Sequence, residues 1–310
     1  VLEGDPFTDG FYIVRNWSAW KNCGARDLNV LHNVMRSKTV REAMRHYRDL
    51  DAVVFDFVMA DISGNIGRQM SGRMYNRSAG SCGLLPLPAW DRKYDLRGFI
   101  LKNRLASSYN PSDGIIISAD NNMDYAAEPN SGKPSAVPYR YKRIRDMLKN
   151  RKKSDAEYMK EIHYDLSSIQ AERFMKEIFP FTDFRKKGRI LKEWNMEYRP
   201  DSEGASIFEN IYESMTEALF WGNGSEKYGL KELFDDPYIF SGYYANIDNI
   251  ILNRNSCWFN SHSWEQFMKL SIESGLKRKY FRYGKKRGIH FRHVFFKDKI
   301  FSTRRFDYGL

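Results

Sequence analysis

The sequence predicts an α+β protein, in which strands and irregular connections come first and helices follow. Strand patterns dominate residues 1–135, helix patterns dominate residues 136–285, and a strand pattern returns in residues 286–310. Apolar residues alternate with others across residues 52–61, which is typical of a strand, and recur at helical spacing across residues 205–221. The sequence contains no run of about eighteen apolar residues, so we expect no helix that spans a membrane.

A β-hairpin is the clearest element expected in the first portion. The mostly apolar run Ala52–Asp61 predicts one strand, and Ile66–Met74 predicts the next. Ser63, Gly64 and Asn65 separate the two runs, and Gly or Asn supplies the positive backbone φ that a tight turn requires.

Other elements of this portion follow from local composition. Phe11–Asn16 has the composition of a strand, and Thr39 with Glu42 forms a capping box for a short helix that ends near Leu50. Residues 78–110 are rich in Gly, Pro and Ser but also carry large aromatic residues, so we expect an ordered, irregular covering loop.

A buried strand is predicted at Gly114–Asp120, because this short apolar run has turn residues on both sides. Asn121 and Asn122 follow it directly. Polar residues at the end of a buried strand are where sheets commonly carry chemistry.

The helical portion is expected to begin near Tyr139. Ser154 and Glu157 form a second capping box, which predicts a helix that runs to Phe179 before Pro180. Two further helices and a final strand are predicted at Ala205–Trp221, Ser263–Tyr283 and His290–Phe296.

The chain is strongly basic, with a formal charge of +11 and a pI near 9.4. One interpretation is an ordinary solvated basic surface, because the cations are spread over several stretches. The alternative is a non-catalytic basic binding module for a polyanion, although nucleic acid is not the favoured partner. The main basic stretches are 36–48, 139–153, 185–192 and 277–287.

Cysteine and histidine spacing does not indicate a metal site. Cys23, Cys82 and Cys257 are widely separated, and their odd number argues against a disulfide framework. His290 and His293 lie three positions apart in a predicted strand, so they would face opposite sides of it.

Motifs of general chemistry do not identify an enzyme either. Asp56, Asp61 and Asp120 are candidate acids, but no local spacing pairs them for acid–base work. His163 lies in a predicted helix, with no serine or cysteine in a nucleophile elbow to pair with it.

Three segments, taken together, carry a resemblance to a known family. Each is weakly specific, but their order and spacing match those of the penicillin acylase family of N-terminal nucleophile hydrolases. The segments are the hairpin ADISGNIGRQMSGR at Ala60–Arg73, the loop LLPLP at Leu84–Pro88 followed by Trp90 and Gly98, and Asn110, Pro111 and Gly114 followed by an apolar strand with Asn121 and Asn122.

This resemblance covers most of the chain and implies both a fold and a reaction. The implied fold is part of the layered αββα core of these hydrolases, with an inserted, mainly helical lobe. The implied reaction is the hydrolysis of a linear amide by an N-terminal serine, which self-cleavage of a precursor exposes and whose own α-amine acts as the base. Because Val1 stands first here, we expect a central fragment of the β-chain region that lacks this serine and is inactive alone.

The resemblance also implies two catalytic residues, Asn121 and Arg143. Asn121 matches the asparagine whose side-chain amide stabilises the oxyanion, and its alternative role is a turn asparagine at a strand end. Arg143 matches an arginine that orients the asparagine and the serine amine, and its alternative role is an exposed cation of a basic helix.

The resemblance also implies a substrate class, partners and a calcium ion. This sequence does not support the calcium ion. The substrate would be a small N-acyl amide such as a penicillin, a cephalosporin or an acyl-homoserine lactone, and the partners would be the missing N-terminal and C-terminal parts of the precursor. Penicillin G acylases hold a structural calcium, but Asn130, Ser131 and Gly132 stand where one of its acidic ligands is expected, so we expect no cofactor. Family members are commonly periplasmic or secreted.

Overall fold

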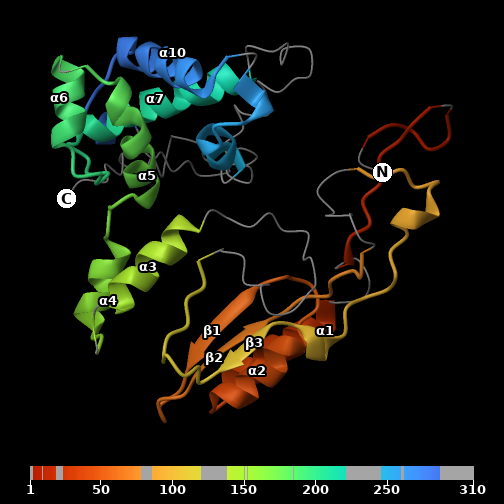
Figure 1. Ribbon diagram of the computed structural model, residues 1–310. Helices are drawn as coiled ribbons and strands as arrows, with labels where there is room; N and C mark the ends of the chain where they lie inside the picture. Colours follow the sequence, from red (N-terminus) through yellow and green to blue (C-terminus); the bar gives the residue numbers. More distant parts are fainter. Residues whose placement is uncertain are drawn as a thin grey trace, which may run out of the picture. The chain divides into compact units, whose positions relative to one another are not determined.

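The chain forms two compact units, Val1–Tyr141 and Lys142–Leu310 (Figure 1). The computed structural model describes residues 3–8, 10–18, 24–77, 86–119, 138–149, 151, 153–183, 185–220, 246–259 and 262–286. The predicted strand at His290–Phe296 and the whole of residues 287–310 lie outside this part of the chain. The expected domain boundaries therefore remain a prediction.

The first unit contains a three-stranded antiparallel sheet of order β1-β2-β3. The predicted hairpin is confirmed: β1 (Asp56–Ala60) pairs with β2 (Ile66–Met70), and Gly64 in the turn has a φ of +82°. β3 (Ser107–Tyr109) pairs with the other edge of β2, inside a stretch expected to be irregular. The hairpin was predictable because its alternation and its turn are local, whereas a three-residue strand leaves little pattern.

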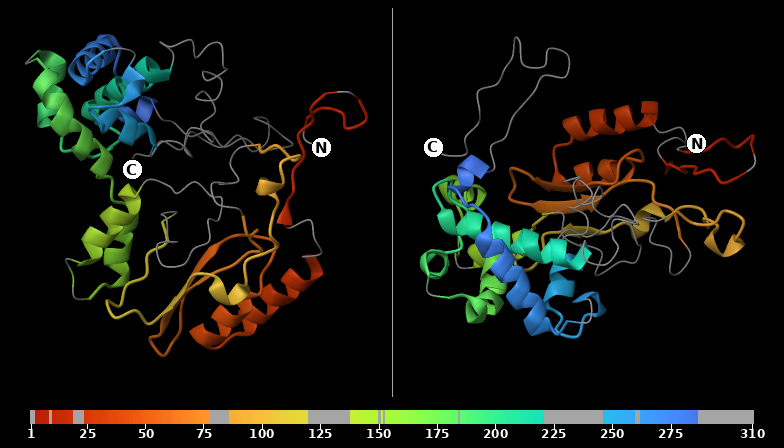
Figure 2. Two further views of the ribbon diagram at one scale, coloured as in Figure 1. Left: turned by 45° about the vertical axis from the view of Figure 1, so that its right-hand side comes forward. Right: turned by 90° about the horizontal axis from the view of Figure 1, so that it is seen from above.

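Two helices, α1 (Gly24–Arg36) and α2 (Val40–Arg48), belong to the same unit (Figure 2). α2 is the helix predicted from the capping box, and the Thr39 hydroxyl accepts a hydrogen bond from the Glu42 amide. α2 packs on the sheet, where Tyr47 stacks on Phe57 at 3.7 Å between ring centroids. A side chain at Gly67 would collide with α2, so glycine permits this close approach.

Two predicted strands of this unit are wrong within the described residues. Phe11–Asn16 contributes only one isolated bridge, between Glu3 and Ile13. The described part of the Gly114–Asp120 run is not in a strand, although Ile117 and Ala119 are buried. The apolar composition of this run therefore indicates a buried segment. It does not specify a strand, because an irregular segment can be buried as well.

A turn directly after β3 explains why the run does not continue the sheet. Asn110 has a φ of +45°, and its side chain accepts from the Ile66 amide and donates to the Asn65 side chain. Gly114 then has a φ of +66° and donates its amide to the Pro111 carbonyl. The left-handed backbone conformation of these two residues turns the chain away from the direction of β3, so it does not continue the sheet.

The second unit is helical, and α3 (Tyr139–Lys149) leads into it. α7 (Glu203–Phe220) and α10 (Trp264–Lys277) confirm two predicted helices, although α10 ends earlier than expected. Residues 246–252 are also helical. The remaining helices are α4 (Ala156–His163), α5 (Ile169–Ile178), α6 (Lys186–Glu193), α11 (Tyr283–Lys286) and short 3-10 turns at Phe179–Phe181 and Cys257–Phe259.

The single helix predicted from Ser154 to Phe179 is wrong, because α4 and α5 are separate. Asp155, rather than Ser154, caps α4 by accepting from the Tyr158 amide, and Ser168 caps α5 by accepting from the Ala171 amide. Ser, like Asp, favours helix starts because its side chain can accept these otherwise unpaired amides.

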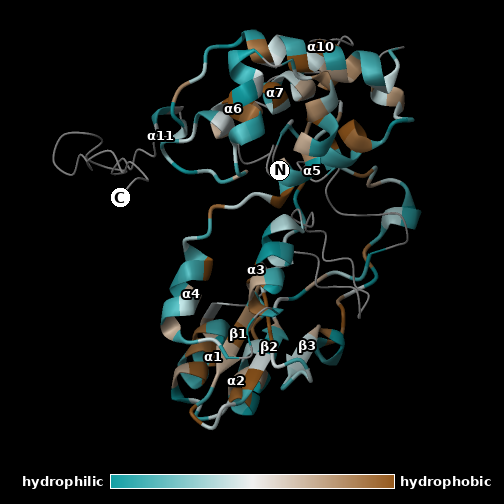
Figure 3. Cartoon of the chain, turned by 60° about the vertical axis from the view of Figure 1, so that its left-hand side comes forward, coloured by the Kyte–Doolittle hydropathy of each residue, from teal (hydrophilic) through white to brown (hydrophobic). Residues whose placement is uncertain are grey.

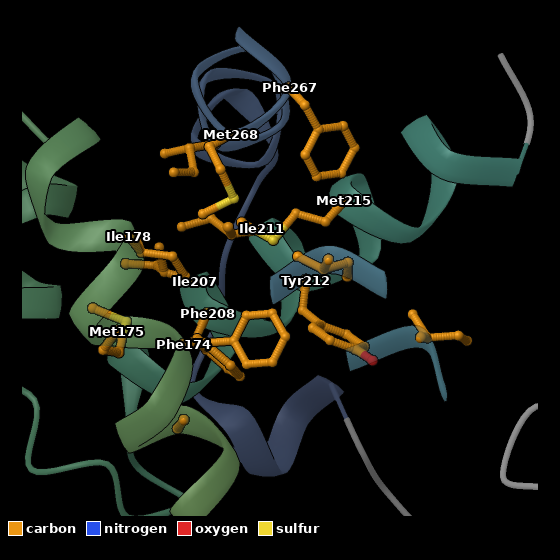
Figure 4. Packing of buried hydrophobic residues seen from close by; sticks show 14 of the residues in the cluster. Phe174, Met175, Ile178, Ile207, Phe208, Ile211, Tyr212, Met215, Phe267 and Met268 are labelled. Carbon is orange, nitrogen blue, oxygen red and sulfur yellow. The ribbon is translucent and has the colours of Figure 1, made fainter. Parts of the chain in front are cut away.

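The core of the helical unit lies between α5, α7 and α10 (Figure 4). Phe174 meets Tyr212 edge to face at 5.4 Å between ring centroids. The helices carry hydrophobic and hydrophilic residues on different faces, as amphipathic helices do (Figure 3). Fully buried residues of this core include Phe174, Met175, Ile178, Phe208, Ile211, Met215 and Met268.

Together, the small sheet and the helical unit confirm the expected α+β class. None of the described helices is long and apolar enough to cross a membrane.

Candidate active site

Arg143 lies on α3 and is held by two acceptors from the segment between α4 and α5. Its Nε donates to Asp165 Oδ2 at 2.8 Å, and its Nη2 donates to Asp165 Oδ1 at 2.7 Å. Nη2 also donates to Ser167 Oγ at 3.2 Å. This bidentate pair lies in a partly buried position, with 34% of the arginine side chain and 14% of the aspartate side chain exposed.

The electrostatics of this cluster keep the guanidinium charged. The hydrogen bonds that Arg143 donates to Asp165 are the main reason that the pKa of Arg143 lies above its usual value. Burial opposes this shift, and the charges of Asp165, Glu172 and Asp146 add to it. A guanidinium so placed can offer a permanent positive charge and fixed N–H donors.

The other edge of the guanidinium is not engaged by this cluster. Within the part of the chain that the structure describes, Nη1 of Arg143 makes no hydrogen bond. Two N–H donors therefore remain for a group outside the described residues, or for a substrate.

Two contacts of Tyr158 connect α4 with α3 and the residues after it. The Tyr158 hydroxyl on α4 donates to the Met147 carbonyl on α3 at 2.8 Å. The guanidinium of Arg151 lies over the same ring at 4.0 Å from its centroid. These contacts tie Tyr158 of α4 to the C-terminal end of α3. Arg143 lies in the middle of α3.

The other predicted catalytic residue, Asn121, lies outside the described residues. That the side chains of Asn121 and Arg143 lie close together therefore stays a prediction. Asp120, His290, His293 and the stretch around Asn130 lie outside them as well. Among the described residues, no group of three or more histidine, cysteine, aspartate or glutamate side chains could hold a metal ion.

The two candidate acids that the structure describes have structural partners. Asp56 accepts two hydrogen bonds from Arg68 across the sheet, at 2.8 and 2.9 Å. Asp61 accepts from the Val40 amide at the start of α2, and from Asn65 in the hairpin turn. The Val40 hydrogen bond is the main reason that the pKa of Asp61 lies below its usual value.

His163 and Cys257 show no catalytic arrangement either. Both are exposed, at the end of α4 and in a short 3-10 turn respectively. Composition and spacing did not predict that Asp165 and Ser167 are the partners of Arg143. Their sequence pattern alone does not reveal a pairing with Arg143, because α4 separates them from it.

Comparison with solved structures shows which known fold this chain shares. The chain is similar to a thermostable penicillin G acylase from Alcaligenes faecalis, with a TM-score of 0.62, 12% sequence identity, and coverage of 83% of this chain and 52% of that chain. This similarity confirms the expected α+β fold.

The sequence model described as penicillin amidase matches residues 5–309. The chain therefore belongs to the penicillin amidase family, whose members are amide-hydrolysing acylases.

The curated relatives are acylases that are much longer than their aligned segments. Acyl-homoserine lactone acylase QuiP of Pseudomonas aeruginosa is 30% identical over 173 residues, which cover 54% of this chain and 20% of that protein. QuiP of Pseudomonas putida is 42% identical over 76 residues, which cover 24% of this chain and 9% of that protein. Penicillin acylase 2 proenzyme of a Pseudomonas species is 26% identical over 149 residues, which cover 48% of this chain and 19% of that protein.

Proposed function

We propose that this chain is part of an amidase that hydrolyses a linear amide bond in a small N-acyl substrate. The candidate substrates are penicillins, cephalosporins, acyl-homoserine lactones and related N-acyl compounds, which fit the names of the relatives. The observation that carries the proposal is the guanidinium of Arg143, held on one edge by Asp165 and offering the donors of its other edge.

The proposed reaction passes through an acyl-enzyme on an N-terminal serine. The serine hydroxyl attacks the amide carbon while its α-amine takes the proton, and the C–N bond then breaks with proton transfer to the leaving amine. Water attacks the resulting ester and releases the acid and the serine. Since the relatives are several times longer than their aligned segments, we place this serine in a part of the protein outside the present sequence.

Asn121 and Arg143 would act on the charge that develops in this reaction. The Asn121 amide would donate to the oxyanion of the tetrahedral intermediate. Arg143 would orient that amide and the serine amine through its Nη1 donors. Fixed donors stabilise a transition state well because they need little rearrangement as the charge forms.

Assays of two forms of the protein test this proposal. The complete precursor and the 310-residue chain alone are each supplied with phenylacetyl amides and acyl-homoserine lactones. We expect the complete protein to hydrolyse these substrates and the isolated chain not to hydrolyse them. Equal turnover by the isolated chain would contradict the position of the serine, and no turnover of any N-acyl substrate by the processed protein would contradict the function.

A further inference from the structure

The orientation of Arg143 depends on a single carboxylate. A guanidinium is planar, so two parallel N–H donors bound to one carboxylate fix its plane and its direction. Because Asp165 takes Nε and Nη2, it determines where the Nη1 donors point. The Ser167 hydroxyl provides a third contact on the same side.

The segment that carries Asp165 is itself held by backbone hydrogen bonds. The Tyr198 amide donates to the Leu166 carbonyl at 2.9 Å, and the Ser168 amide donates to the Met196 carbonyl at 3.0 Å. Ser167 and Glu197 form an isolated antiparallel bridge. The residues after the end of α4 are thus tied to a second segment of the helical unit.

That second segment is anchored to the helical core. The Trp194 indole is buried and donates to the Glu197 carbonyl at 2.8 Å. The Tyr198 hydroxyl donates to Glu209 on α7 at 2.9 Å. Met196 has a φ of +60°, which is unusual for a residue other than glycine and indicates a tightly determined turn. A continuous set of contacts therefore runs from α7 to Asp165 and on to Arg143.

We propose that Asp165 is a positioning residue for the reaction, which aims the free edge of Arg143 at the catalytic centre. This inference rests on the proposed function. An alternative is that the pair only stabilises the fold. An ion pair with a third of its arginine exposed contributes modestly to stability, so a stabilising role and a positioning role predict different losses.

The test uses Asp165→Asn in the complete, processed protein. Asparagine keeps the size of the side chain but cannot accept both guanidinium donors. We expect kcat to fall by about 10- to 100-fold with KM nearly unchanged, because an interaction that matters mainly in the transition state is weakened. Asp165→Glu, which keeps the carboxylate, should restore part of the lost kcat.

Two comparisons separate positioning from stability. Arg143→Gln and the double variant Arg143→Gln/Asp165→Asn should have the same kcat, since Asp165 acts only through Arg143. Asp56→Asn is the matched control, because it breaks the Asp56–Arg68 pair of the same bidentate geometry in the sheet. It should lower the melting temperature and leave the kcat of the folded protein unchanged. A normal kcat for Asp165→Asn, or an additive double variant, would overturn the inference.

A measurement independent of activity distinguishes failure of the inference from failure of the function. Hydrogen exchange at the Arg143 Nε–H, followed by NMR, should be slow in the wild type and in Asp56→Asn, and fast in Asp165→Asn. If the processed protein hydrolyses no amide, the proposed function fails and this exchange still decides whether Asp165 holds the arginine. Equally fast exchange in the wild type and in Asp165→Asn would show that Asp165 does not hold the Arg143 guanidinium.

Discussion

At the scale of single residues, the carboxylate of Asp51 shows how this chain uses a buried charge. Its side chain is fully buried, and Arg73, Lys102 and Arg26 surround it at 2.5, 2.9 and 3.5 Å. Burial raises the pKa of Asp51, but the hydrogen bonds and charges of Lys102 and Arg73 outweigh it, so the net pKa is lowered. The charged form is therefore stabilised by folding.

Replacing Asp51 with asparagine should destabilise the protein at neutral pH. We expect a loss of about 1–3 kcal/mol in the free energy of unfolding, the usual cost of leaving such donors poorly paired. Because the folded-state pKa is below the unfolded value of about 3.9, the contribution is present above that pH and is lost as the pH falls through the folded-state pKa.

Urea denaturation at a series of pH values measures this difference. Wild type and Asp51→Asn should begin to converge below about pH 4 and should meet only when the pH has fallen below the lowered folded-state pKa of Asp51, where the carboxylate is protonated in both states. Asp95→Asn, at an exposed position, is the control and should differ from wild type by less than about 0.5 kcal/mol. A pH-independent difference for Asp51→Asn would show that the charge does not matter.

Asn121 provides the second prediction at this scale. In the complete, processed protein, Asn121→Ala should lower kcat by about 10²- to 10³-fold, because the proposed donor to the oxyanion is removed. The melting temperature should change little. Steady-state kinetics with an acyl-homoserine lactone or a phenylacetyl amide measure the effect, and a near-normal rate would assign the oxyanion to another donor.

At the scale of elements, the sequence predicted those whose signals are local. The Gly64 turn, the Thr39 cap and the spacing of Ile207, Ile211, Met215 and Leu219 each specify their element from neighbouring residues. The break between α4 and α5 was not predicted, because Asp165 and Ser167 leave the helix to contact Arg143, and Ser168 contacts Met196. Such tertiary contacts override a helical pattern without leaving a local signal.

The contact between α7 and α10 depends on Gly275. A Cβ at this position would lie 2.5 Å from Ile211 Cα and 2.9 Å from the Asn210 carbonyl oxygen. These are backbone atoms, so Gly275→Ala should force the helices apart and cost about 1–3 kcal/mol, more than the helix propensity gained.

Thermal unfolding followed by circular dichroism tests this expectation. Gly24→Ala is the matched control, because a Cβ there meets nothing within 4 Å at the start of α1. The control should unfold at or slightly above the wild-type temperature, and Gly275→Ala several degrees below it. Equal temperatures for all three proteins would mean that α7 and α10 can separate at no cost.

At the scale of the whole molecule, the family was predictable from three dispersed segments, while the ion pair at the candidate site was only half predictable. Arg143 was identified because it matches a family position on a recognisable basic helix. Its pairing with Asp165 was not predicted, because the two residues lie on separate elements that only the folded chain brings together. Spacing along a sequence specifies neighbours within an element, and only the folded chain brings separate elements together.

The net charge of +11 remains the basis of the alternative function, a polyanion-binding module. Several cations already have acidic partners in the folded chain, including Arg68, Arg73, Lys102, Arg143 and Arg278. On α3, Lys142, Arg145 and Lys149 are exposed and spread along the helix. Dispersed, solvated cations hold a polyanion weakly, whereas a built site neutralises many phosphates at once.

Retention on heparin over a range of salt concentrations distinguishes the two functions. A built site with about six to ten phosphate contacts would lose roughly 10³- to 10⁵-fold in affinity between 50 and 200 mM salt. We expect instead a shallow dependence, with release at about 0.2 M salt or below, because exposed charges are largely screened at that ionic strength. Lys142→Glu/Arg145→Glu should change this release only slightly, since no single cluster holds the heparin. A steep salt dependence that this double variant abolishes would favour the polyanion site on α3 over an ordinary basic surface.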